Sequence, residues 1–372
     1  MKEKKTIVFL FYRECLCLTP FLAMIDGLCK HYSVKVISCE KPGDIDKLEK
    51  MYENKDVEFL SKVRQTQLPK VLRSIRARIN RNPYVSQDFK KEARKIIETI
   101  SYDLLWVVHE YTLNEFKDFL KDKQYVVSLY ELNDSNLKFL KGIKESLHKA
   151  QEVIVAEYNR ACITRTWLQL EKTPTVIPNK PLNHPRERFI ENDFSGVLKD
   201  KKIIIYQGSI VKNRNLDKIC EALSDMPEYT LVLMGKDGSD YVKDLKQINP
   251  NIIYISHIDP PKHLYITSYA HIAILKYDFV VLNSIYCAPN KTWEYSGFGI
   301  PTLCNAIPGL QYTIGSYHAG VCTDLDDVKS IKEAVIEIET NYNYYSENAL
   351  HYFESVDLEK ELLAIANRNI VK

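Results

Sequence analysis

Short apolar runs that recur along the whole chain constrain its fold more than any other feature of the sequence. The runs are rich in β-branched residues, most are followed by a glycine or a polar residue, and segments with helical spacing separate them. The predicted strands are residues 6–11, 34–38, 103–110, 125–129, 153–157, 175–179, 202–208, 230–235, 252–255, 271–275 and 301–304. Because strands that alternate with helices form parallel sheets, the chain is predicted to be an α/β protein.

The length of the chain indicates two domains rather than one. It has 372 residues, of which 45% are hydrophobic and 27% charged, an ordinary composition for a globular protein. Residues 180–200 are rich in proline and charge and lack periodicity, which is typical of a linker. We therefore predict a first domain at residues 1–180 and a second at 181–349. The stretch after them, from about residue 350 to 372, is expected to be a helix long enough to return to the first domain.

Charge and cysteine content argue against several classes of protein. The formal net charge of +2 gives no general case for nucleic-acid binding. The nine cysteines are scattered through apolar segments without C-x-x-C spacing, so they are predicted to be reduced core residues rather than zinc ligands. The apolar run after the basic N-terminus is too short for a signal peptide or a membrane span, so we expect a cytoplasmic protein.

The stretch at residues 286–310, YCAPNKTWEYSGFGIPTLCNAIPGL, combines groups suited to an anion with a group suited to a sugar. Pro289 favours a helix start, where the amides near Asn290 and Lys291 are expected to bind a diphosphate with help from the helix dipole. Glu294 lies one turn further along, and its carboxylate can accept two hydrogen bonds from the cis-diol of a ribose. Together these groups predict a nucleotide site. An ordinary amphipathic helix with a solvated Glu294 is the alternative.

This stretch resembles the donor-site signature of family 4 glycosyltransferases, which have the GT-B fold. The resemblance extends over most of residues 150–325 and rests on Ala288-Pro289-Asn290-Lys291, Glu294-Tyr295 and Gly299-Ile300-Pro301. It implies an α/β fold of two Rossmann-like domains that face each other across a cleft, with a C-terminal helix crossing back to the N-terminal domain. Members usually carry two glutamates separated by seven residues. Glu294 matches the second, whereas Tyr286 stands at the position of the first, which lies close to the sugar of the donor.

Further donor contacts are expected at the strand ends of the second domain. Gly208 lets the backbone approach a ligand after the first of these strands, and Arg214 can donate to a phosphate. The family usually has an arginine directly after that glycine, where this chain has Ser209. Gly235 ends the next strand, and the resemblance places the loop at Ile258 beside the base of the nucleotide.

Polar residues that follow two strands of the first domain are the candidate acceptor site. In doubly wound sheets the ligand crevice lies at the carboxyl ends of the strands, so His109 and Glu131 are predicted to face it. The family often has a histidine at the second of these strand ends, where Tyr130 stands here. His109, Tyr130 and Glu131 are therefore the candidate catalytic residues, and Glu131 is expected to orient the acceptor hydroxyl or accept its proton. A structural role is the alternative for His109.

Residues 62–95 carry eleven Lys and Arg residues against two acidic ones. Leu68, Leu72, Ile75 and Ile79 are spaced for one face of a helix, and Arg73, Arg76 and Arg78 fall mostly off it. This pattern predicts a basic amphipathic helix. It is either a surface helix of the first domain or a patch that docks on anionic lipid at the inner face of the cell membrane.

The leading functional hypothesis is a retaining hexosyltransferase that moves a sugar from a nucleotide diphosphate donor to a glycan or lipid-linked acceptor. The resemblance implies a role in bacterial surface-polysaccharide biosynthesis. Arg214 and the amides near Asn290 would stabilise the departing diphosphate, so no metal or other cofactor is expected. A nucleotide-sugar 2-epimerase of the same fold is one alternative. A catalytically degenerate nucleotide-binding subunit is another, because Tyr286 and Ser209 depart from the family pattern.

Overall fold

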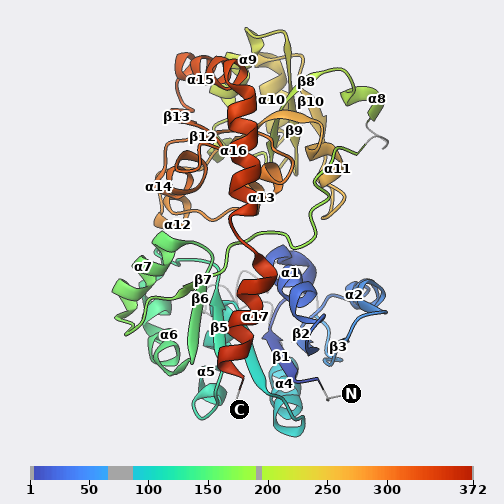
Figure 1. Ribbon diagram of the computed structural model, residues 1–372, viewed down its shortest axis with the longest axis vertical. Helices are drawn as coiled ribbons and strands as arrows, with labels where there is room; N and C mark the ends of the chain where they lie inside the picture. The colour runs from blue at the N-terminus through green and yellow to red at the C-terminus, as the bar shows by residue number, and fades with distance from the viewer. Residues whose placement is uncertain (1–3, 66–86, 190–194, 371–372) are drawn as a thin grey trace. The chain divides into compact units, whose positions relative to one another are not determined.

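The computed structural model describes residues 4–65, 87–189 and 195–370, and these contain two parallel β-sheets flanked by helices (Figure 1). Each sheet is the centre of a compact unit. The first unit comprises Met1–Pro178 and Leu358–Lys372, and the second comprises Asn179–Asp357. The α/β prediction is thereby confirmed. The basic segment with Arg73, Arg76 and Arg78 lies outside the described residues.

The first sheet has the strand order β3-β2-β1-β4-β5-β6-β7, with every neighbouring pair parallel. Its strands are β1 (Thr6–Phe11), β2 (Ser33–Ser38), β3 (Val57–Phe59), β4 (Leu104–Val108), β5 (Val126–Leu129), β6 (Glu152–Val155) and β7 (Thr175–Val176). The helices of this unit are η1 (Cys15–Cys17), α1 (Thr19–Leu28), α2 (Asp44–Tyr52), α4 (Gln87–Thr99), α5 (Glu110–Leu120), α6 (Leu137–Lys149), α7 (Tyr158–Leu168) and α17 (Leu358–Asn369). The strand order reverses between β1 and β4, so a ligand crevice is expected beyond the carboxyl ends of these two strands.

The central strands of this sheet are buried on both faces, as their continuous apolar sequences require. All five residues of β4 are buried. The ring of Trp106 in β4 lies 5.5 Å from that of Phe9 in β1, and its indole N–H donates to Ser128 Oγ at 2.9 Å. The buried indole thus keeps a polar partner while its ring fills the core.

The second sheet has the strand order β10-β9-β8-β11-β12-β13 and is also parallel throughout. Its strands are β8 (Lys202–Gln207), β9 (Tyr229–Met234), β10 (Ile253–Ile255), β11 (Ala270–Leu275), β12 (Thr302–Asn305) and β13 (Gly320–Thr323). The helices are α8 (Ser195–Leu198), η2 (Lys212–Arg214), α9 (Asp217–Ser224), α10 (Tyr241–Ile248), α11 (Leu264–Thr267), α12 (Leu282–Ile285), α13 (Asn290–Ser296), α14 (Pro308–Leu310), η3 (Gln311–Gly315), α15 (Val328–Thr340) and α16 (Tyr342–Glu354). Here the strand order reverses between β8 and β11.

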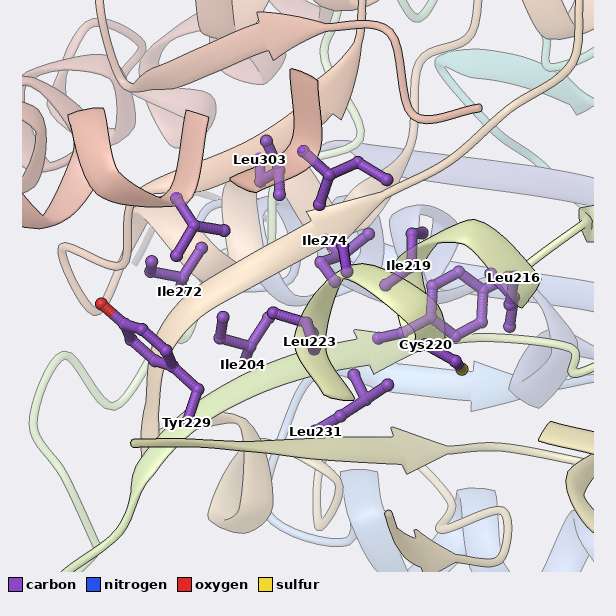
Figure 2. Close-up of a cluster of buried hydrophobic side chains, with 14 of the residues drawn as sticks. Ile204, Leu216, Ile219, Cys220, Leu223, Tyr229, Leu231, Ile272, Ile274 and Leu303 are labelled. Carbon is purple, nitrogen blue, oxygen red and sulfur yellow. The ribbon is translucent and has the colours of Figure 1, made fainter. Parts of the chain in front are cut away.

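A single apolar cluster joins the helix α9 to the face of this sheet (Figure 2). Ile204 and Ile274, from the neighbouring strands β8 and β11, are both fully buried. Ile219 and Leu223 from α9 belong to the same cluster and are also buried. Burying one such side chain contributes about 1.5–3 kcal/mol, so this cluster holds β8 and β11 side by side at the point where their order reverses.

The C-terminal stretch forms two helices, α16 in the second unit and α17 in the first, separated by residues 355–357, so the helix that belongs to the first unit begins at Leu358 rather than near residue 350. Lys180 explains the break, because its buried ammonium donates to the carbonyls of Phe353 and Val356, each at 2.5 Å. These carbonyls are the ones that a helix end leaves without an intrahelical partner. After the break α17 packs on α1, as Figure 1 shows, and Tyr32 Oη donates to Asn367 Oδ1 at 2.8 Å.

The segment predicted as a linker, residues 180–200, belongs to the second unit. Residues 179–188 pack on that unit through polar side chains. Asn179 Nδ2 donates to the carbonyl of Ala288 at 2.7 Å, and His184 Nε2 lies 2.9 Å from the carbonyl of Glu294. None of the helices described here is long and apolar enough to cross a membrane.

Candidate functional site

The candidate site of the second unit lies at the carboxyl ends of β8 and β9, where two glycines bring the backbones together. Gly208 follows β8 with φ of +150°, and Gly235 follows β9 with φ of +153°. A Cβ atom on Gly235 would lie 1.7 Å from the carbonyl oxygen of Gly208. A side chain therefore cannot fit at position 235, because the backbone of Gly208 occupies that space.

Two cationic side chains lie near the carboxyl end of β8. The Lys291 side chain approaches Gly208, because its Cε would be 3.9 Å from a Cβ atom placed there. Arg214 ends η2, and its guanidinium carbon lies 5.2 Å from the centre of the Tyr277 ring. Burial raises the pKa of Tyr206, the neighbour of Gln207 in β8, and the positive charge of Arg214 partly offsets this rise. Lys291 and Arg214 thus place positive charge near the carboxyl end of β8.

Glu294 is buried on α13, and one of its carboxylate oxygens is held by two donors. Gln207 Nε2 donates to Oε2 at 3.0 Å, and His263 Nε2 lies 3.2 Å from the same oxygen. Oε1 makes no hydrogen bond to the described part of the chain. It is not sealed from solvent either. One oxygen is therefore fixed and the other is open.

The environment of Glu294 keeps it ionised. Burial acts to raise the pKa of its carboxyl group, but the hydrogen bond from His263 and the attraction of His263 and Lys291 outweigh burial, so the pKa lies below its usual value. A carboxylate in this state accepts hydrogen bonds only. Its open oxygen is suited to a neutral hydroxyl group.

The start of α13 differs in detail from the sequence prediction. Pro289 is the N-cap in an extended conformation, with φ of −74° and ψ of 140°, so the helix begins at Asn290. The amide of Thr292 donates to the carbonyl of Pro289 at 3.3 Å and is therefore engaged within the first turn of the helix. Tyr286 is half-buried directly after α12 and donates its amide to the carbonyl of Leu282 at 2.8 Å.

The other two predicted donor residues lie in loops at the same end of the sheet. Ser209 is exposed, and its carbonyl accepts from Tyr206 Oη at 3.2 Å. Ile258 follows β10, is half-buried and packs against the core cluster on the second face of the sheet.

In the first unit, His109 begins α5 at the carboxyl end of β4. It is buried with φ of +78°, a conformation that is uncommon for a residue other than glycine. Its ring stacks with those of Tyr111 and Tyr130, at 5.2 and 5.9 Å. Its Nδ1 lies 3.4 Å from the amide nitrogen of Tyr111 and 3.4 Å from Glu110 Oε2.

A second carboxylate, Glu110, is buried at these strand ends, whereas the predicted candidate Glu131 is exposed. Glu110 is 1% exposed and accepts from the Tyr130 amide and from Asn133 Nδ2, each at 3.0 Å. Glu131 has an exposed side chain, and its carbonyl accepts from Asn133 Nδ2 at 3.1 Å. Glu131 is thus exposed at the carboxyl end of β5, and its predicted role toward the acceptor stays a prediction.

Tyr130 is held at both its carbonyl and its hydroxyl group. Its carbonyl accepts from Arg160 Nη1 at 2.5 Å, and its hydroxyl lies 3.4 Å from Met24 Sδ. Burial raises the pKa of this hydroxyl, and the charge of Glu110 adds to the rise. A hydroxyl in such surroundings stays protonated at neutral pH.

Sequence reasoning missed Gln207, His263 and Glu110. Gln207 carried a local signal, because it is the polar last residue of an apolar strand directly before Gly208. No local pattern in the sequence indicated His263, because its contact with Glu294 depends on how α11 packs against α13.

Comparison with known proteins supports these observations for the second unit and for the fold. Residues 188–351 match the model of a protein family described as Glycosyl transferases group 1. The search of curated proteins gave no match.

Solved structures match over nearly the whole chain. Anabaena HepE in complex with UDP has a TM-score of 0.69 at 14% identity, covering 98% of this chain and 99% of that one. Sucrose-phosphate synthase from Thermosynechococcus elongatus has a TM-score of 0.67 at 14% identity, covering 98% of each chain. WaaG, a glycosyltransferase involved in lipopolysaccharide biosynthesis, has a TM-score of 0.64 at 12% identity, covering 98% of this chain and 100% of that one. The chain therefore has the GT-B fold with two Rossmann-like domains, as predicted.

Proposed function

We propose that this chain is a retaining glycosyltransferase of family 4 that transfers a hexose from a nucleoside diphosphate donor. The observation that carries the proposal is the state of Glu294, with one oxygen held by Gln207 and His263 and the other without a hydrogen bond to the described residues. The match of residues 188–351 to Glycosyl transferases group 1 supports the same activity. The structures of HepE in complex with UDP and UDP-glucose make a uridine donor the first to test.

In this proposal the second unit binds the donor by three kinds of contact. The open oxygen of Glu294 accepts from a ribose hydroxyl, and the amides at the start of α13 bind the diphosphate. Lys291 and Arg214 stabilise the negative charge that grows on the diphosphate as it leaves, which is an electrostatic contribution to catalysis. The loop at Ile258 contacts the base, and Tyr286 lies near the donor sugar.

The first unit is proposed to bind the acceptor at the residues after β4 and β5. The Nε2 atom of His109 is the ring nitrogen suited to a donor or acceptor sugar, because Nδ1 faces the Tyr111 amide and the Glu110 carboxylate. Tyr130 shapes this site through its ring, and the exposed carboxylate of Glu131 is the candidate base for the acceptor hydroxyl.

We further propose a glycan or lipid-linked acceptor, and a cytoplasmic protein that is peripheral at the inner face of the membrane. One observation supports the acceptor class, and another supports the location at the membrane. WaaG, which has the same fold, is involved in lipopolysaccharide biosynthesis. The basic segment with Arg73, Arg76 and Arg78 has the composition of a patch that binds anionic lipid.

A thermal-shift screen with UDP, GDP, CMP and dTDP tests the donor site, because a ligand that binds only the folded state raises Tm. Incubation of the purified chain with the matching sugar nucleotide then tests the reaction. Release of the nucleoside diphosphate supports the transferase, and a changed sugar still attached to the nucleotide would indicate the epimerase. Binding without any turnover would indicate the degenerate subunit.

A further inference from the structure

A closed ring of hydrogen bonds surrounds the fixed oxygen of Glu294. Gln207 Nε2 donates to Oε2, and Gln207 Oε1 accepts from Thr267 Oγ1 at 2.8 Å. Thr267 Oγ1 also lies 3.1 Å from the carbonyl of His263, whose ring reaches the same Oε2 at 3.2 Å. The ring thus ties together the last residue of β8, the short helix α11 and the helix α13. Thr267 is 0% exposed, and Gln207 and His263 are each 8% exposed.

The donor roles within this ring are fixed by chemistry. A carboxylate oxygen only accepts, so Nε2 of His263 carries a proton, and Gln207 presents its amide N–H₂ to the same oxygen. Two donors on Oε2 leave the carboxylate no freedom to rotate about its last side-chain bond, and Oε1 is directed to the open side. Without them, the carboxylate could exchange its two oxygens and lose its orientation.

The surroundings of the His263 ring are unfavourable for the stability of the fold. Its Nδ1 is sealed from solvent and finds no hydrogen-bond partner in residues 4–65, 87–189 and 195–370. A buried polar atom without a partner destabilises a fold, and an apolar side chain of similar size would avoid this cost. The one contact that a histidine gains here is the contact with Glu294.

We propose that His263 and Gln207 are positioning residues that aim the open oxygen of Glu294 at a ribose hydroxyl, and that the site therefore selects ribonucleotide over 2′- or 3′-deoxyribonucleotide donors. This inference rests on the proposed donor site. It predicts that thymidine-linked donors, whose sugar is 2′-deoxyribose, bind poorly if the 2′-hydroxyl is the one recognised.

The test compares a nucleoside diphosphate with its 2′-deoxy and 3′-deoxy forms by calorimetry, using UDP or GDP, whichever raises Tm more. A hydrogen bond to a charged acceptor corresponds to a preference of at least about tenfold for the ribose form over one of the two analogues in the wild-type protein. In His263→Leu this preference should fall to about two- to threefold. A purely structural role would instead weaken all three ligands equally and leave the ratio unchanged.

Two further variants complete the test. In His263→Gln the side-chain amide can reach the position of Nε2, so most of the preference should return. His351→Leu, an exposed histidine on α16, is the matched control and should keep the wild-type ratio. If His263→Leu does not fold, Gln207→Leu takes its place with the same expected loss.

The outcomes separate this inference from the proposed function. Binding of no nucleotide by the wild-type protein would refute the donor site itself. Tight binding with an unchanged ratio in folded His263→Leu and Gln207→Leu would overturn only the positioning role. Equal affinity of the wild-type protein for the ribose and both deoxyribose forms would also overturn it.

Discussion

Replacing Glu294 by Ala should reduce both the stability of the free protein and its affinity for nucleotide, for two separate reasons. Removal of the carboxylate leaves Gln207 Nε2 and His263 Nε2 buried without their shared acceptor. Each buried donor that loses its partner costs about 1–3 kcal/mol, so the loss of both partners should lower the free energy of unfolding by about 2–6 kcal/mol. The loss of the open oxygen removes at least one hydrogen bond to the ribose, which weakens nucleotide binding by about 10- to 100-fold.

Urea unfolding and calorimetric titration with UDP measure these two effects independently. Glu347→Ala is the control, because Glu347 is exposed on α16 and should show neither effect. A folded Glu294→Ala protein with lowered stability but unchanged affinity would refute the ribose contact. Unchanged stability would refute the hydrogen-bond network around Glu294.

Three other predictions concern the backbone, the pH dependence and the membrane. Gly235→Ala should prevent folding or lower the unfolding free energy by about 4 kcal/mol or more, judged by circular dichroism, because its Cβ would lie 1.7 Å from the Gly208 carbonyl oxygen. Burial lowers the pKa of His184 from 6.5 to about 4, so the unfolded chain binds more protons between these values. Stability should thus fall by up to about 3 kcal/mol as pH drops through this window, and urea titrations of His184→Gln should show a flatter profile. Neutralising Arg73, Arg76 and Arg78 together should release the protein from anionic vesicles in sedimentation, whereas binding that resists both this change and salt would leave the predicted helix a structural role.

The alternation of strands and helices was predictable because it depends on local residue patterns. The central strands β1, β4, β8 and β11 are short apolar runs, and the sequence located each of them. The edge strands β3 and β13 were missed. They have only three and four residues, too few for a strand pattern to emerge.

Features that depend on contacts between distant residues were not predictable. The break between α16 and α17 depends on Lys180, which is 173 positions away from Phe353. The pair Gln207 and Glu294 is separated by 87 positions. The buried contacts of Glu110 with the Tyr130 amide and Asn133 likewise join residues that are 20 and 23 positions apart.

The most direct test of the central claim is the turnover of a sugar nucleotide by the purified chain and by Arg214→Ala. The wild-type protein should release nucleoside diphosphate from the donor that its nucleotide screen identifies. Arg214→Ala should fold with nearly unchanged Tm, since Arg214 is only partly buried, but should turn over at least about tenfold more slowly because positive charge on the leaving diphosphate is lost. Turnover by the variant at the wild-type rate, or no turnover of any sugar nucleotide by the wild-type chain, would contradict the account.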